Sequence, residues 1–125
     1  MTARPTDLTD LGAELDLAHR LADLADAISL PLFERRSFSV DWKANRTEVT
    51  EADRRAETAI SDYLTTERPD HAMFGEEHGG RGAQDAEWRW VIDPIDGTKS
   101  FVSGVPLYST LLSYEVDGEP IVGVC

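Results

Sequence analysis

The sequence predicts a layered fold of the α+β or α/β kind, in which helices pack against a sheet. Segments with helical spacing of apolar residues alternate with short apolar strands along the chain. Two further strands flank Asp117-Gly118, a dipeptide that favours a tight β-hairpin turn. No internal repeat or linker-like segment interrupts the 125 residues, so we expect one unit with a real core.

Two segments are predicted to be helices. From residue 7, leucine and alanine recur every three or four positions, and Pro31 is expected to end or kink this helix. The second helix begins at Thr50-Glu51-Ala52-Asp53, which matches a capping box, and continues to about Leu64.

Short apolar or alternating runs predict the strands, which are residues 37–42, 72–74, 88–92, 107–116 and 120–124. Residues 78–87, rich in glycine and charge, are predicted to form a mobile loop, and residues 102–106 another loop. The tryptophans are interpreted as core or rim packing (Trp42, Trp88 and Trp90). The histidines fit no metal-ligand spacing and are interpreted as surface or structural residues (His19, His71 and His78).

The composition narrows the functional classes. A formal net charge of −12 argues against a nucleic-acid or anionic-membrane surface. No apolar run approaches the roughly 20 residues of a membrane span, and the N-terminus lacks the pattern of a secretory signal. The single cysteine, Cys125, excludes an internal disulfide, so we expect a cytoplasmic protein. The acidic charge agrees with a metal-dependent phosphate site but does not require one.

The most informative stretch is Asp93-Pro94-Ile95-Asp96-Gly97-Thr98, which follows an apolar run. Mg²⁺ prefers oxygen ligands, and Asp93, Asp96 and the Ile95 carbonyl offer them. Gly97 allows close backbone approach, and a helical turn beginning near Thr98 would present free N–H groups to phosphate. The alternative interpretation is an ordinary turn, since Asp-Gly commonly marks one.

Two other phosphate motifs fail on spacing. A Walker A loop needs G-x-x-x-x-G-K-[ST], and no glycine lies upstream of Gly97-Thr98-Lys99-Ser100 at that spacing. The haloacid-dehalogenase-type motif D-x-D-G-T places its aspartates two residues apart. Here they are three apart, which favours metal ligation over a covalent aspartyl-phosphate.

Four further residues are candidates with an open alternative. Glu76 and Glu77 follow a predicted strand end, and Glu76 is the better candidate for a third metal ligand, with Glu77 behind it or exposed. Asp53 is either only the last residue of the capping box or a functional acid. Lys43 is usually just a solvated loop cation at such a position.

Three motifs in order make the chain similar to the inositol monophosphatase-like superfamily of Mg²⁺-dependent, lithium-sensitive phosphatases. They are Val49-Thr50-Glu51-Ala52-Asp53, Gly75-Glu76-Glu77 and Asp93-Pro94-Ile95-Asp96-Gly97-Thr98. The resemblance runs from the first helix to Cys125. The segment from Asp96 to Phe101, with Gly104-Val105-Pro106-Leu107-Tyr108 and Thr110-Leu111-Leu112, most resembles the histidinol-phosphatase branch, although Ser100 stands where the superfamily pattern has Asn.

The resemblance implies a sandwich of helices on a largely antiparallel sheet, with two or more Mg²⁺ ions per site. Metal ligands would be Glu76, Asp93, the Ile95 carbonyl and Asp96; Gly97 and Thr98 would hold phosphate. Asp53, Thr98 and Glu76 would serve catalysis, with Asp53 and the Thr98 hydroxyl orienting the attacking water, and Lys43 would lie near the phosphate or a further metal. The partner would be a small phosphorylated metabolite, and the full-length protein would be a homodimer.

Residues 1–125 would form the N-terminal portion of such a phosphatase domain, truncated within the sheet. The family's second half supplies another Asp ligand and most contacts to the non-phosphate part of the substrate. We therefore expect little activity from these residues alone. The candidate functions are hydrolysis of histidinol phosphate in histidine biosynthesis, hydrolysis of inositol 1-phosphate, and an inactive fragment with residual Mg²⁺ and phosphate binding.

Overall fold

A computed structural model describes residues 8–36, 38–43 and 48–125. The helices are α1 (Leu8–Arg35), α2 (Glu51–Glu67) and α3 (Thr98–Ser103). The strands are β1 (Val40–Trp42), β2 (Glu48–Thr50), β3 (Ala72–Gly75), β4 (Gly79–Arg81), β5 (Trp88–Asp96), β6 (Ser109–Val116) and β7 (Glu119–Val124). Residue 7, where the first helix was predicted to begin, and Ser37, the first residue of the first predicted strand, lie outside the described residues.

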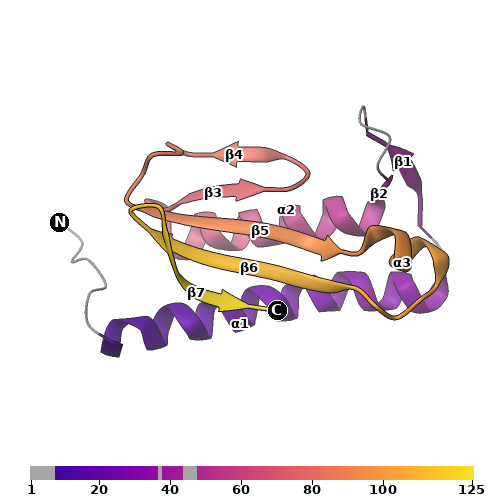
Figure 1. Ribbon diagram of the computed structural model, residues 1–125, viewed down its shortest axis with the longest axis horizontal. Coiled ribbons are helices and arrows are strands. Elements are labelled where there is room, and N and C mark those ends of the chain that lie inside the picture. The colour runs from indigo at the N-terminus through magenta and orange to yellow at the C-terminus, as the bar shows by residue number, and fades with distance from the viewer. Residues whose placement is uncertain (1–7, 37, 44–47) are drawn as a thin grey trace.

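The main sheet has the strand order β4-β3-β5-β6-β7. Strands β3 and β5 are parallel, and the other neighbours are antiparallel. Helices α1 and α2 run behind this sheet, along the direction of its strands (Figure 1). The predicted layered α+β architecture, with helices on a largely antiparallel sheet, is confirmed.

The core lies between the two long helices and one face of the sheet. Strands β5 and β6 alternate, so that every second side chain points toward the helices, as the two-residue period of a strand requires. The buried side chains of this core are Leu17, Ala18, Leu21, Ala25, Ala56, Ile60, Leu64, Met73, Trp90, Ile92, Leu112 and Tyr114. The predicted packing role of Trp90 is confirmed, since its side chain is fully buried.

A second, smaller apolar cluster lies where β5 passes into α3. Phe101 of α3 is fully buried, and its ring lies 5.5 Å from that of Phe33, 4.9 Å from Phe38 and 4.9 Å from Tyr108. Tilted and edge-on ring pairs of this kind add to the burial energy. This cluster holds α3 against α1 and fixes the path of the chain after Asp96.

The predicted hairpin is confirmed between β6 and β7. Asp117 and Gly118 join the strands with φ angles of 51° and 83°. Two successive left-handed residues match the right-handed twist of the strands, which is why Asp-Gly is favoured at this position.

The prediction of a mobile loop for residues 78–87 was wrong in its first part, because Gly79–Arg81 form β4 and pair antiparallel with β3. Gly79 has a φ of 75°, which permits the tight turn between the strands. The Gln84 side-chain amide then donates to the carbonyl oxygens of Met73, Arg81 and Gly82 at 3.0–3.3 Å. Strand β4 contains no apolar side chain from which a strand could have been predicted, and these hydrogen bonds lie beside it instead.

Pro31 does not end the first helix, which continues to Arg35. Proline removes one backbone donor but leaves the following turn able to form. Here Arg36 N donates to Leu32 O at 3.0 Å, and the Leu32 side chain is buried in the smaller cluster. Tertiary packing therefore stabilises the last helical turn, which follows Pro31.

The first predicted strand is shorter than expected and does not join the main sheet. Val40–Trp42 pair only with Glu48–Thr50, which had been left without a strand prediction. The expectation that Trp42 packs in the core or its rim was also wrong, because Trp42 is 66% exposed. In the described part of the chain, no helix has both the length and the apolar character needed to cross a membrane.

Candidate active site

The site is organised around the C-terminal end of β5. Between Asp93 and Asp96 the chain advances three residues, whereas the paired strand β6 advances two, from Leu111 to Ser109. One extra residue therefore lies in β5, which is a β-bulge. In a regular strand, residues three apart point to opposite faces of the sheet. The extra residue lets Asp93 and Asp96 point to the same face. The Thr110 hydroxyl holds the bulge by donating to Pro94 O at 2.9 Å.

Gly97 turns the chain from β5 into α3. Its φ of 93° is left-handed, and an added Cβ would lie 2.8 Å from Leu107 O. Both facts require glycine here. The predicted helical turn at Thr98 is confirmed, because α3 begins at that residue and Phe101 N donates to Gly97 O at 3.0 Å.

The capping-box role considered for Asp53 is confirmed, and its functional role stays a prediction. Its Oδ2 accepts from the Thr50 backbone N–H at 2.9 Å and completes the capping box of α2. Its Oδ1 accepts from the Thr98 hydroxyl at 3.1 Å. The structure thus joins the first turn of α2 to the first residue of α3 through a fully buried carboxylate.

Lys43, Glu76 and Glu77 meet beside these residues. The Lys43 Nζ lies 3.0 Å from Glu77 Oε2 and 3.5 Å from Glu76 Oε1. Burial alone would lower the pKa of Lys43, but the two carboxylates raise it above its ordinary value. Lys43 is therefore an ion-pair partner and not a solvated loop cation.

The two glutamates differ in exposure, and Glu77 is not the more exposed of them. The Glu77 side chain is 6% exposed, whereas that of Glu76 is 54% exposed. Burial raises the pKa of Glu77, although the Lys43 ammonium opposes this shift. Glu76 therefore remains the glutamate whose carboxylate is accessible from solvent.

Asp93 is the residue of the site whose pKa is shifted most. Its pKa is raised to about 6, first by burial and then by repulsion from Glu76, Asp96, Asp53 and Glu77. Carboxylates that repel one another in a partly buried place favour either a proton or a cation. This cluster therefore suits a positively charged ligand.

The donor set fits Mg²⁺ in kind, since it consists only of carboxylate and carbonyl oxygens. Within residues 8–36, 38–43 and 48–125, however, no three His, Cys, Asp or Glu side chains are arranged so as to hold a metal ion. The assignment of Glu76, Asp93, the Ile95 carbonyl and Asp96 as ligands stays a prediction.

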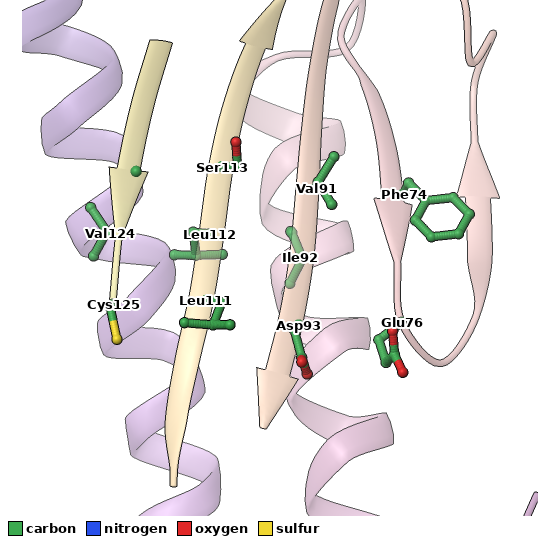
Figure 2. Close-up of a pocket in the computed structure, with 11 residues that line it drawn as sticks. Phe74, Glu76, Val91, Ile92, Asp93, Leu111, Leu112, Ser113, Val124 and Cys125 are labelled. Carbon is green, nitrogen blue, oxygen red and sulfur yellow. The ribbon is translucent and has the colours of Figure 1, made fainter. Parts of the chain in front are cut away.

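A groove of about 450 Å³ opens from this cluster along the sheet face opposite the helices. Figure 2 shows Glu76 and Asp93 close together at one end of the groove, with apolar side chains along the rest of it. Those side chains include Phe74, Val91 and Leu111. The carboxylates thus lie at the end of an open apolar surface.

One residue of the site was missed by sequence reasoning. Glu57, one helical turn after Asp53, is fully buried and accepts from the backbone N–H groups of Glu77 at 2.8 Å and His78 at 2.6 Å. The signal was its spacing: Asp53 and Glu57 are four apart on α2 and so share a helix face.

Comparisons with known proteins agree with this geometry. The model of the inositol monophosphatase family matches residues 14–125. A histidinol-phosphatase from Chlorobaculum parvum is 45% identical over 111 residues, and one from Streptomyces coelicolor is 44% identical over 115. Each alignment covers 89% of this chain and 42% of the relative, so the chain spans less than half the length of these proteins.

A solved structure gives the same result for the fold. The extragenic suppressor protein SuhB from Bartonella henselae superposes with a TM-score of 0.83 at 27% identity, covering 90% of this chain and 44% of that one. Because the family model matches far more than half of the described residues, the chain belongs to the inositol monophosphatase family.

Proposed function

We propose that this chain carries the metal-binding part of a phosphomonoesterase that hydrolyses histidinol phosphate to histidinol. The observation that supports it most is the cluster of repelling carboxylates at the end of β5, directly beside the backbone N–H groups of Gly97 and Thr98. Such a cluster of carboxylates can bind Mg²⁺, and the neighbouring N–H groups can donate hydrogen bonds to phosphate. The identity with histidinol-phosphatases supports this substrate.

Glu76, Asp93, Asp96 and the Ile95 carbonyl would hold Mg²⁺, two or more ions per site. When bound, Mg²⁺ would lower the pKa of a water molecule and offset charge on the phosphate and its leaving oxygen. The carboxylates must be ionised to bind it. The pKa of Asp93 is raised to about 6 in the metal-free chain, so protons should compete with Mg²⁺ at mildly acidic pH.

Asp53 and Thr98 would orient the attacking water. The Thr98 hydroxyl donates to Asp53 Oδ1 at 3.1 Å, which leaves its lone pairs able to accept from water. Asp53 is itself held by Thr50, so the hydroxyl has a fixed position. Gly97 and Thr98 would direct their N–H groups to phosphate oxygens, while Lys43 would lie at the edge of the site.

The substrate assignment is tested by measuring phosphate release. Histidinol phosphate and inositol 1-phosphate are offered with Mg²⁺ to the 125-residue chain and to the product of the whole open reading frame that contains it. We expect the product of that reading frame to prefer histidinol phosphate. Preference for inositol 1-phosphate would establish the alternative substrate, and release that does not depend on Mg²⁺ would refute the proposal.

The second candidate is a non-catalytic chain that retains Mg²⁺ and phosphate binding. It is the alternative that the sequence analysis left open, and the same phosphate assay tests it. We expect the 125-residue chain alone to show little turnover, and turnover near that of the product of the whole reading frame would contradict this. A stop codon directly after Cys125 in the coding DNA would favour the second candidate.

A further inference from the structure

We propose that Glu57 is a positioning residue, whose buried carboxylate fixes the turn that presents Glu76 to the divalent cation. This inference rests on the proposed function, since it concerns the same metal site. Glu57 itself lies behind the turn. It would act through the backbone and would not touch the metal.

The first support is the pair of hydrogen bonds. Glu57 Oε1 accepts from Glu77 N at 2.8 Å, and Oε2 accepts from His78 N at 2.6 Å. A carboxylate that accepts from two successive backbone N–H groups fixes both peptide planes, and such charge-assisted bonds are about twice as strong as neutral ones. The turn directly after Glu76 is therefore held at two points.

The second support is the cost of placing this charge here. The Glu57 side chain is fully buried, and no Lys or Arg of the described ranges forms an ion pair with it. A buried carboxylate is tolerated only when its hydrogen bonds are satisfied. The two N–H groups provide that satisfaction, so the turn and the carboxylate stabilise each other.

The third support is Gly75. A Cβ added at this residue would lie 2.3–2.6 Å from the carboxyl atoms of Glu57. A side chain at this position would therefore require the Glu57 carboxylate to move. The carboxylate thus lies against the last residue of β3, directly before Glu76.

Helix α2 thereby connects both halves of the site. Asp53 in its first turn binds the Thr98 hydroxyl, and Glu57 one turn later binds the turn after Glu76. Glu76 N in addition donates to Ile92 O of β5 at 3.0 Å. The position of Glu76 relative to Asp93 is therefore set from the helix side as well as from the sheet.

The test compares Glu57→Gln with two controls on the same helix. A glutamine can accept from one N–H group only, and its own amide would oppose the other. Glu67→Gln makes the same change at an exposed position, and Ile60→Val weakens the core without touching the turn. For each chain we measure the Mg²⁺ dissociation constant by calorimetry, hydrogen exchange of the Glu77 and His78 amides without metal, and the unfolding midpoint.

We expect Glu57→Gln to lose protection at both amides and to bind Mg²⁺ about 10- to 100-fold more weakly, the range typical of residues that support metal ligands. Both controls should retain protection and affinity. A purely structural role predicts that Ile60→Val, at a similar loss of stability, weakens Mg²⁺ binding equally. That result, or unchanged affinity in Glu57→Gln, would overturn the proposal.

Gly75→Ala is the second variant, should Glu57→Gln not fold. It keeps the charge but displaces the carboxylate, and we expect the same loss of protection and affinity; unchanged values would again overturn the proposal. If the unmodified chain binds no Mg²⁺, the proposed function fails. Amide exchange then decides the anchoring by itself: lost protection in the variants supports it, and retained protection overturns it.

Discussion

The two ends of β5 differ in how their charged side chains are arranged. At its beginning, charged groups are paired: Arg68 donates twice to Glu14, and Arg89 donates twice to Glu115 across the β5–β6 pair. At its far end, several carboxylates repel Asp93, and the Lys43 ammonium pairs with two of them, Glu76 and Glu77. The first end stabilises the fold, and the second end stores unfavourable charge that a cation would relieve.

His71, which precedes β3 and contacts the beginning of β5, continues this contrast. His71 Nδ1 accepts from Trp90 Nε1–H at 3.2 Å, and its ring stacks on Tyr114 with centroids 5.7 Å apart. Burial lowers the pKa of His71 and raises that of Tyr114, so both rings stay neutral at ordinary pH. The structural role predicted for His71 is confirmed, whereas the unrelieved charge lies where function is proposed.

The largest effect should come from removing charge at the far end. Asp96→Asn takes away one proposed ligand, and we expect Mg²⁺ affinity to fall at least about 100-fold and phosphate release to be lost, because a missing ligand costs more than a missing supporting contact. Calorimetric titration and a phosphate assay measure this. Asp16→Asn, at an exposed position of α1, is the control. Unchanged affinity would refute the metal-site assignment.

Removing a charge at the paired end should instead affect stability. Arg68→Met leaves the nearly buried Glu14 without its cation, and we expect the free energy of unfolding to fall by about 2–3 kcal/mol in urea denaturation. Arg55→Met breaks the exposed pair with Glu51 and should cost less than about 0.5 kcal/mol. Equal losses in the two variants would contradict the contrast between buried and exposed pairs.

Mg²⁺ should stabilise the chain in a pH-dependent manner. The pKa of Asp93 is raised to about 6, so its contribution to the stability of the metal-free chain is present at low pH and is lost as pH rises through about 6. We expect saturating Mg²⁺ to add about 1–2 kcal/mol near pH 7.5 and much less near pH 5, where protons compete. Thermal unfolding with and without Mg²⁺ measures this. Asp93→Asn should remove the difference between the two pH values.

The smallest effect should come from His71, with the opposite sign. Its folded pKa is lowered, so its contribution to stability is complete above about pH 6.5 and is lost as pH falls below that value. We expect a loss of about 0.5–1 kcal/mol between about pH 7 and pH 5.5. The slope should be absent in His71→Asn, as measured by unfolding midpoints across a pH series. A slope that persists would assign the effect to another group.

Local patterns were enough to predict much of the fold. The capping box at Thr50, the Asp-Gly hairpin turn and the apolar alternation in β5 each act through neighbouring residues, and each was confirmed. Strand β4 could not be predicted, because it contains two glycines and an arginine and no apolar residue, and the hydrogen bonds beside it come from Glu57 and Gln84, which are distant in sequence from the residues they bind. The passage of α1 through Pro31 likewise depends on packing from distant residues.

The site was predicted in its residue types and less well in its arrangement. The proximity of Glu76 and Asp93 and the helical turn at Thr98 agree with the sequence motifs, whereas the roles of these residues stay predictions. The greater burial of Glu77 and its pairing with Lys43 depend on how the turn after β3 packs against α2. That packing involves residues about 20 positions apart, which spacing within one motif does not reveal.

Because of the bulge in β5, the candidate site depends more on the number of residues between Asp93 and Asp96 than on which residues they are. Conservative replacement of Pro94 or Ile95 would change packing, whereas deletion of either residue would restore a regular ladder and send the Asp96 side chain to the other face. Single-codon deletions between Asp93 and Asp96 should therefore be tolerated less than any substitution there.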